Sequence, residues 1–143
     1  MDAEERAYCE SLVQTAHSSI EIAKGLMKAG MYEAVVFYAA LAGENVANAL
    51  IVALGGRPSR RHRADIALHT YFKTKGEKMP AEIEQAVEKL KWLEPHVTTS
   101  RYPIKVGGKW VPPANRYRKG DAEKALKYAK AIVRVVEKCL QRG

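Results

Sequence analysis

The segment from Tyr32 to Leu54 constrains the fold of this chain more than any other. Apolar and small residues recur along it at spacings of three and four, and Gly55-Gly56 closes it. This spacing gathers apolar residues on one face of a helix, and paired glycines are a strong helix stop. Its alanines and Gly43 would let neighbouring helices approach closely. The segment is therefore expected to be a helix that packs closely against neighbouring helices.

The same spacing predicts a helix from about Ala3 to Lys28. A connection of only two or three residues separates it from the helix that begins at Tyr32. So short a connection makes the two helices an antiparallel hairpin. A short helix is expected over residues 64–72. Another is expected from Pro80, at its first helical position, to Leu93, with Pro95 stopping or bending it. Asp121 begins the last helix.

Residues 97–118 are rich in proline and glycine, which predicts an ordered or partly mobile loop. No stretch shows sustained alternation of apolar and polar residues, and no repeat has a fixed period. We therefore predict an all-α fold, an up-and-down bundle of four to five helices with a long loop before the last helix. A chain of 143 residues can bury one sizeable core, so residues 1–143 are expected to form a single domain.

We also expect a cytoplasmic protein that does not enter a membrane. No window approaches the run of about 18 apolar residues that a membrane span needs, and the N-terminus is acidic and polar, unlike a signal peptide. The two cysteines, Cys9 and Cys139, lie in helices at opposite ends of the chain, which argues against a metal site or a disulfide framework while leaving one pairing open. No motif calls for a cofactor.

The net charge of +8 is concentrated in two segments. Residues 55–76 hold six basic side chains and one acidic one, and residues 95–120 hold six basic side chains and no acidic one. The rest of the chain is slightly acidic. Local positive patches usually indicate an anionic partner, although solvated loops in a basic protein would look the same.

The first basic segment holds the candidates for phosphate binding and for catalysis. We expect Arg57, Arg61 and Arg63 to form an electrostatic patch for phosphate groups. Four residues separate Arg57 from His62, and five separate Arg63 from His69. Such a pair could cleave RNA, with the histidine as general acid or base and the arginine stabilising the developing charge. Arg63 and His69 would lie about 120° apart on a helix, so they would not share one face.

Glu44 lies in the middle of the helix predicted over residues 32–54, with apolar or small neighbours on most sides. A buried carboxylate is costly unless it is paired, so we expect an arginine or tyrosine partner. A structural ion pair and a functional role both remain open.

In the second basic segment, Arg101, Tyr102, Trp110 and Tyr117 interleave cations with aromatic rings. Such a combination could stack on bases while the basic groups hold phosphates. Alternatively, the aromatic rings anchor a long loop onto the bundle.

These residues stand in an order that resembles the HEPN domain, a small all-α bundle. The stretch 41–50, with its Glu44, resembles the second helix of that family, and Arg57-Pro58 with Arg61-His62 resembles the loop into the next helix. Ser100-Arg101-Tyr102-Pro103 matches the Arg-Tyr-Pro element of the family. Tyr117 and the stretch 121–126 follow as in the family, so the resemblance covers nearly the whole chain.

The resemblance implies a homodimer that often works beside a small nucleotidyltransferase in a toxin–antitoxin pair and binds nucleotide or RNA. Ribonuclease members carry an arginine, four to six residues and a histidine near the last long helix. Here no histidine follows Arg101 or Arg118 in that region. The helix over residues 32–54 also suggests a dimer, because apolar residues lie outside its apolar face, namely Val36, Phe37, Leu41 and Ile51.

Our leading hypothesis is a dimeric domain that binds nucleotide or RNA in a basic groove. Arg101 and Arg61 would hold phosphate, Tyr102 would stack or orient, and Glu44 would position Arg101. The alternatives are a metal-independent endoribonuclease using an Arg/His pair, and a protein-interaction module without ligand chemistry that docks an acidic partner.

Overall fold

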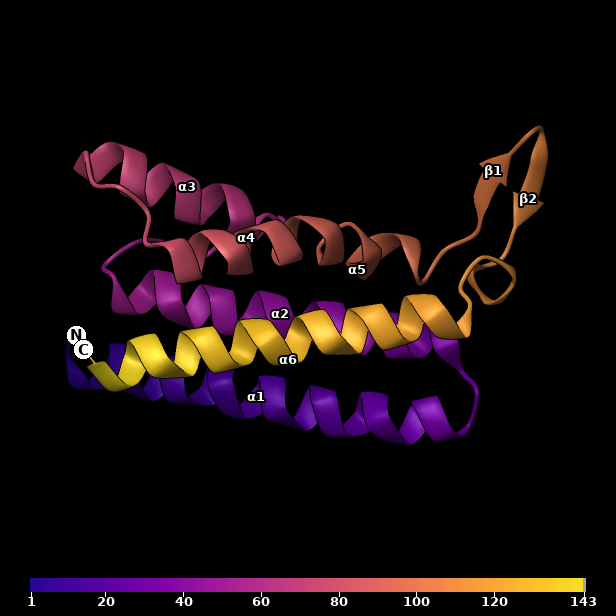
Figure 1. The fold of residues 1–143 in the computed structure, drawn as a ribbon, viewed down its shortest axis with the longest axis horizontal. Coiled ribbons are helices and arrows are strands. Elements are labelled where there is room, and N and C mark those ends of the chain that lie inside the picture. Colours follow the sequence, from indigo (N-terminus) through magenta and orange to yellow (C-terminus); the bar gives the residue numbers. More distant parts are fainter. Residues whose placement is uncertain (143) are drawn as a thin grey trace.

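The computed structural model describes residues 1–142, and most of them are helical (Figure 1). The longer helices are α1 (Ala3–Lys28), α2 (Tyr32–Ala53), α3 (Ala64–Lys75), α4 (Ala81–Leu93) and α6 (Lys119–Arg142). Between α4 and α6 lie the one-turn helix α5 (His96–Thr99), the strands β1 (Ile104–Val106) and β2 (Lys109–Val111), and the 3-10 turn η1 (Pro113–Asn115). The predicted all-α bundle is confirmed.

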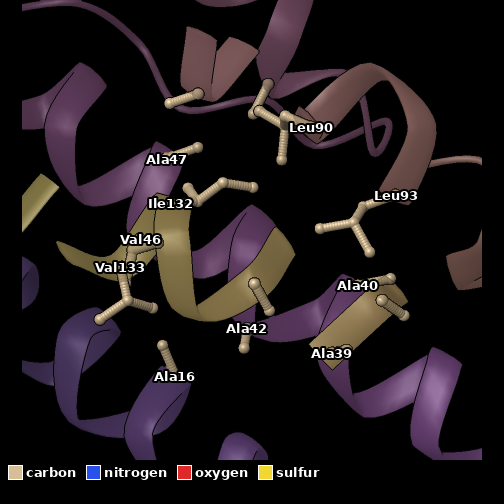
Figure 2. Packing of buried hydrophobic residues seen from close by; sticks show 14 of the residues in the cluster. Ala16, Ala39, Ala40, Ala42, Val46, Ala47, Leu90, Leu93, Ile132 and Val133 are labelled. Atoms are coloured by element: carbon tan, nitrogen blue, oxygen red, sulfur yellow. The ribbon is translucent and has the colours of Figure 1, made fainter. Parts of the chain in front are cut away.

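The core is built around α2, which packs against α1, α4 and α6. Figure 2 shows small α2 side chains meeting larger ones from α4 and α6, among them Leu93 and Ile132. A β-carbon at Gly43 would lie 3.2 Å from Cδ1 of Leu93 and 3.4 Å from Cδ1 of Ile132. Glycine at this position therefore lets α4 and α6 approach the central helix closely.

The composition of α2 alone would suit a membrane span, with a mean hydropathy of 1.6 over its most apolar window. Of that window, 78% is buried inside the bundle, as is usual for a helix covered on most sides. Val36 and Ile51, expected to lie outside the main apolar face, are buried within this single chain. Phe37 and Leu41 are only partly buried.

Residues 104–111 form a β-hairpin inside the segment that was expected to be a loop. The strands pair antiparallel with Lys105 opposite Trp110, and Gly107 and Gly108 form the turn at φ +55° and +80°. Positive φ at both positions suits a two-residue hairpin turn of the primed type. Each strand has three residues, too few for an alternating pattern to stand out. The hairpin projects beyond the end of the bundle where α2 and α6 begin (Figure 1).

The helix boundaries differ slightly from the predicted ones. Helix α3 continues to Lys75 and ends at Gly76, whose φ of +67° suits a glycine C-cap. Pro80 is the N-cap of α4 and not its first residue. The last helix begins at Lys119, and Asp121 lies inside its first turn.

Candidate ligand-binding face on α2

The loop that follows α2 returns along the helix. The backbone N–H of Ser59 donates to Oδ1 of Asn48 at 3.0 Å, and Nδ2 of Asn48 donates to the Ser59 carbonyl at 3.5 Å. Asn48 is 6% exposed, and a buried amide in an apolar helix has to find partners. This side chain therefore holds the loop against α2.

Glu44 lies one turn earlier on the same side of α2 and contacts the same loop. Nδ1 of His62 lies 2.8 Å from one Glu44 carboxylate oxygen and 3.0 Å from the other. Glu44 is buried, whereas the side chain of His62 is 43% exposed. Because a carboxylate only accepts, Nδ1 carries the proton, and Nε2 is the ring nitrogen available for proton exchange.

His62 has a backbone conformation that side chains rarely adopt. Its φ is +57°, the one positive value outside glycine among residues 1–142. The neighbouring backbone is fixed by Ser59, whose Oγ accepts from the N–H groups of Arg61 at 3.2 Å and Arg63 at 3.0 Å. Strained residues that their surroundings hold in place often cluster at functional sites.

The arginines of this loop point outward while its backbone is held. Arg57, Arg60, Arg61 and Arg63 are all exposed. Nε of Arg63 contacts Asp65 at 3.1 Å, and within the described chain no ion pair involves the other three. The loop therefore offers charged groups to solvent from a fixed backbone.

Glu94, at the end of α4, binds the beginning of α3. Its two carboxyl oxygens accept hydrogen bonds from the backbone N–H groups of Ala64 at 2.8 Å and Asp65 at 2.9 Å. Glu94 is 1% exposed. Burial raises its pKa to about 8, an effect that the two N–H donors oppose and the Asp65 carboxyl reinforces. Glu94 thus fixes the end of the arginine-rich loop to the α4–α5 bend.

The second basic segment reaches α2 through Arg101. Its Nε donates to the carbonyl of Val97 at 2.8 Å, and its guanidinium lies 5.2 Å from the ring centre of Phe37 and 5.3 Å from that of Tyr102. Phe37 precedes Glu44 by seven residues, which is nearly two full turns of α2, or about 10 Å along its axis. Arg101 and His62 therefore approach the same side of α2 at different heights.

We call this side the α2 face and define it by Phe37, Glu44 and Asn48 with the groups that contact them. At 100° per residue, these three positions fall within about 40° of one another around the helix and span about 16 Å along it. Both basic segments contact this face. The expected contact between Glu44 and Arg101 is absent from the ion pairs and hydrogen bonds of the described chain, because nearly two turns of α2 separate their positions.

Tyr117 anchors the second segment to the bundle. It is 7% exposed, and its hydroxyl lies 2.7 Å from Nδ1 of His96 and 2.8 Å from Oγ1 of Thr99. Burial lowers the pKa of His96. Nη2 of Arg116 donates to the carbonyls of Thr99 and, at 3.0 Å, Tyr102. These contacts match the anchoring alternative for Tyr117 and leave little of its ring open to a ligand.

The predicted site residues therefore divide into groups. Glu44, His62 and Arg101 lie on the α2 face, and Tyr102 contacts Arg101. Arg57, Arg61 and Arg63 are exposed on the loop that Asn48 and Glu44 hold against α2. His69 is exposed on α3 and makes no hydrogen bond or ion pair within the described chain. Asn48, Ser59 and Glu94 were not predicted as site residues from the sequence. Asn48 had a usable signal, since it is a second polar residue four positions after Glu44 in an apolar helix.

A cleft lies away from this face, between the first half of α1 and the end of α6. Its volume is about 520 Å³, and Cys9, Val13, His17, Glu137 and Leu140 are among its lining residues. Both cysteines are free thiols. Within residues 1–142, no group of three His, Cys, Asp or Glu side chains is placed to hold a metal ion.

Comparisons with known proteins place this arrangement in a family. A protein of Methanocaldococcus jannaschii named "Putative toxin MJ1304" is 28% identical over 136 residues, which cover 94% of this chain and 89% of that protein. The crystal structure of TT1696 from Thermus thermophilus superposes with a TM-score of 0.71 at 26% identity, covering 91% of this chain and 96% of that one. The HEPN domain matches residues 9–139. The chain therefore belongs to the HEPN domain family.

Proposed function

We propose that this protein binds nucleotide or RNA phosphates along the α2 face. The observation that carries the proposal is the meeting of both basic segments on one side of α2, with Arg101 over Phe37 and His62 on Glu44. A solvated loop in a basic protein would also account for the charge of either segment taken alone. Two such segments on one face form a band of positive charge, and phosphates are the anions that arginines bind best in pairs.

The loop geometry supports phosphate binding in a second way. Arg57, Arg60 and Arg61 are exposed and lack carboxylate partners in the described chain, so a ligand would not have to break an ion pair. Because Asn48 and Ser59 hold the backbone of the loop, little conformational entropy would be lost on binding.

The homodimer is part of the same proposal. Phe37, which Arg101 contacts, and Leu41, one turn further along α2 toward Glu44, are only partly buried, so a second copy could cover them and bring the basic segments of two chains together. Light scattering at micromolar concentration would test this. Leu41→Asp is expected to reduce the mass to that of a monomer, and a monomeric parent would overturn the dimer.

We also propose a toxin–antitoxin setting with a nucleotidyltransferase partner, supported by family membership and by the name of the M. jannaschii relative. Co-expression with the protein encoded beside it, followed by affinity purification, would test this. A stable complex supports the partnership. Separate elution of the two proteins at low salt would contradict it.

The binding proposal is tested by measuring the affinity of a fluorescent oligonucleotide across a salt series. Arg61→Ala and Arg101→Ala should each weaken binding and reduce the slope of log affinity against log salt by about 1, because each removes a phosphate contact. Arg134 is an exposed arginine on α6, and Arg134→Ala is the matched control. It should change neither the affinity nor its salt dependence. Equal affinities and slopes for all four proteins would refute the proposal.

A second candidate is RNA cleavage, which the Glu44–His62 contact specifically favours. A carboxylate on Nδ1 fixes the tautomer of the ring and leaves Nε2 to take the proton of a ribose 2′-hydroxyl as its oxygen attacks the adjacent phosphorus. The bond from phosphorus to the 5′-oxygen then breaks, the leaving 5′-oxygen takes a proton from the imidazolium or from water, and Arg61 or Arg57 offsets the charge that develops on the phosphate. His62→Gln should abolish cleavage and retain RNA binding. His69→Gln serves as the control, and cleavage that survives in His62→Gln would exclude this mechanism.

A further inference from the structure

The β-hairpin of residues 104–111, which we call the arm, exposes a tryptophan in the middle of its second strand. Trp110 is 69% exposed, more than any other large hydrophobic residue in the described chain. Tryptophan carries a large apolar surface, and a fold normally gains by burying it. Trp110 contributes little to the bundle, so its placement on a projecting arm requires another explanation (Figure 1).

The arm is held firmly at its base. Arg116, which follows the hairpin, donates to the carbonyls of Thr99 and Tyr102, which precede it, and Tyr117 is buried beside Thr99. The backbone bonds of β1 and β2 and the Gly107-Gly108 turn then fix the tip. Trp110 is consequently presented to solvent from a defined position and not from a freely moving loop.

The chemistry around Trp110 is cationic. Lys105 lies directly across the hairpin, with Nζ 5.9 Å from the centre of the indole ring, and Lys109 precedes Trp110 in β2. Residues 95–120 contain no acidic side chain. An exposed ring with the Lys105 ammonium group on the same face of the hairpin suits a nucleobase whose neighbouring phosphate pairs with a lysine.

The size of the arm argues for a base and against a protein surface. Each strand has three residues, whereas a specific protein interface needs about 1,000 Å² or more of buried area. A base needs only one face of the ring. In a duplex, both faces of each internal base are already stacked, so the ligand that fits is single-stranded.

We propose that Trp110 is a base-stacking site, with Lys105 beside it, for a single-stranded nucleic acid whose backbone lies on the α2 face. This inference rests on the proposed phosphate-binding function and specifies the class of its ligand. Tyr102 is 54% exposed and contacts Arg101. In the sequence it lies between Arg101, which reaches the α2 face, and the hairpin that carries Trp110.

The test compares short fluorescent oligouridine with an RNA duplex of the same length. Trp110→Ala should weaken binding of the single strand about 5- to 150-fold, because stacking contributes that much per base, and Trp110→Phe should recover part of the loss. The slope of log affinity against log salt should be the same for Trp110→Ala as for the parent, since stacking releases no counterions. Affinity for the duplex should not change. In a Trp92→Phe background, unlabelled oligouridine should quench the fluorescence of Trp110.

The outcomes separate this inference from the proposed function. If Arg61→Ala and Arg101→Ala weaken binding but Trp110→Ala does not, the stacking site is refuted and the phosphate band stands. An equal loss for single strand and duplex would refute single-strand selectivity. If the arginine variants also have no effect, the band itself fails. Loss of binding to an acidic protein, without loss of binding to oligouridine, would assign the arm to a protein partner instead.

Discussion

The two basic segments carry similar charge but are held by the fold in opposite ways. The loop of residues 55–63 lies against α2, and buried Glu44, Asn48 and Glu94 hold it or the residues directly after it. The segment of residues 100–118 is held at its base by Arg101, Arg116 and Tyr117, and its hairpin extends from the bundle (Figure 1). The first arrangement suits fixed placement of cations. The second suits reaching a ligand beyond the helices.

The largest stability effect should come from Glu94, because it supports the loop from inside the core. Glu94→Ala leaves two backbone N–H groups at the start of α3 without acceptors and should cost about 2–4 kcal/mol in the free energy of unfolding. Glu88→Ala, an exposed glutamate on the same helix, should cost less than about 0.5 kcal/mol. Urea denaturation measures both. Similar midpoints for the two variants would show that the loop does not depend on Glu94.

Glu94 should also make stability depend on pH. Its pKa is raised to about 8, so between roughly pH 4.5 and 8 the folded protein keeps a proton that the unfolded chain releases. This group therefore stabilises the fold fully at the acidic end of that range, and its contribution is lost as the pH rises through 8. Glu94→Gln should be less damaging than Glu94→Ala and should flatten this decline. Urea denaturation of the parent and of Glu94→Gln at several pH values measures this. If the free energy of unfolding falls with pH equally steeply in both proteins, the assignment to Glu94 is wrong.

A smaller effect is expected at Asn48, which holds only the middle of the loop. Asn48→Ala should lower the free energy of unfolding by about 1–2 kcal/mol and raise hydrogen exchange at the Ser59 amide, because that amide loses its buried acceptor. Asn45→Ala, three residues earlier and with no side-chain hydrogen bond within residues 1–142, is the control. Unchanged exchange at Ser59 in the Asn48 variant would mean that the loop is held by other contacts.

Sequence patterns predicted the parts of the molecule that depend on local periodicity. The apolar spacing in residues 3–28 and 32–54 gives α1 and α2 almost to the residue, because nearly every turn of these helices repeats the signal. The hairpin was missed since its strands are three residues long, although Gly107-Gly108 between Val106 and Lys109 was a usable turn signal.

The candidate site was predicted in composition but not in connectivity. The partner of Glu44 was expected to be an arginine or tyrosine, with Arg101 preferred, and it is His62. This choice depends on how the loop folds back over α2, which Asn48 and Ser59 decide through contacts eleven residues apart in the sequence. Likewise, Glu94 lies about thirty residues from the N–H groups it binds, and no local pattern announces such a contact.

The smallest stability effects should appear in the arm, with its base and tip behaving differently. Tyr117→Phe removes the hydroxyl bonded to His96 and Thr99 and should cost about 0.5–1.5 kcal/mol. Trp110→Ala should change the free energy of unfolding by less than about 0.5 kcal/mol, since its ring is mostly exposed. Thermal and urea denaturation would compare the two variants. A large loss of stability in Trp110→Ala would mean that the tip packs on the bundle, and the contrast between a held loop and a reaching arm would then fail.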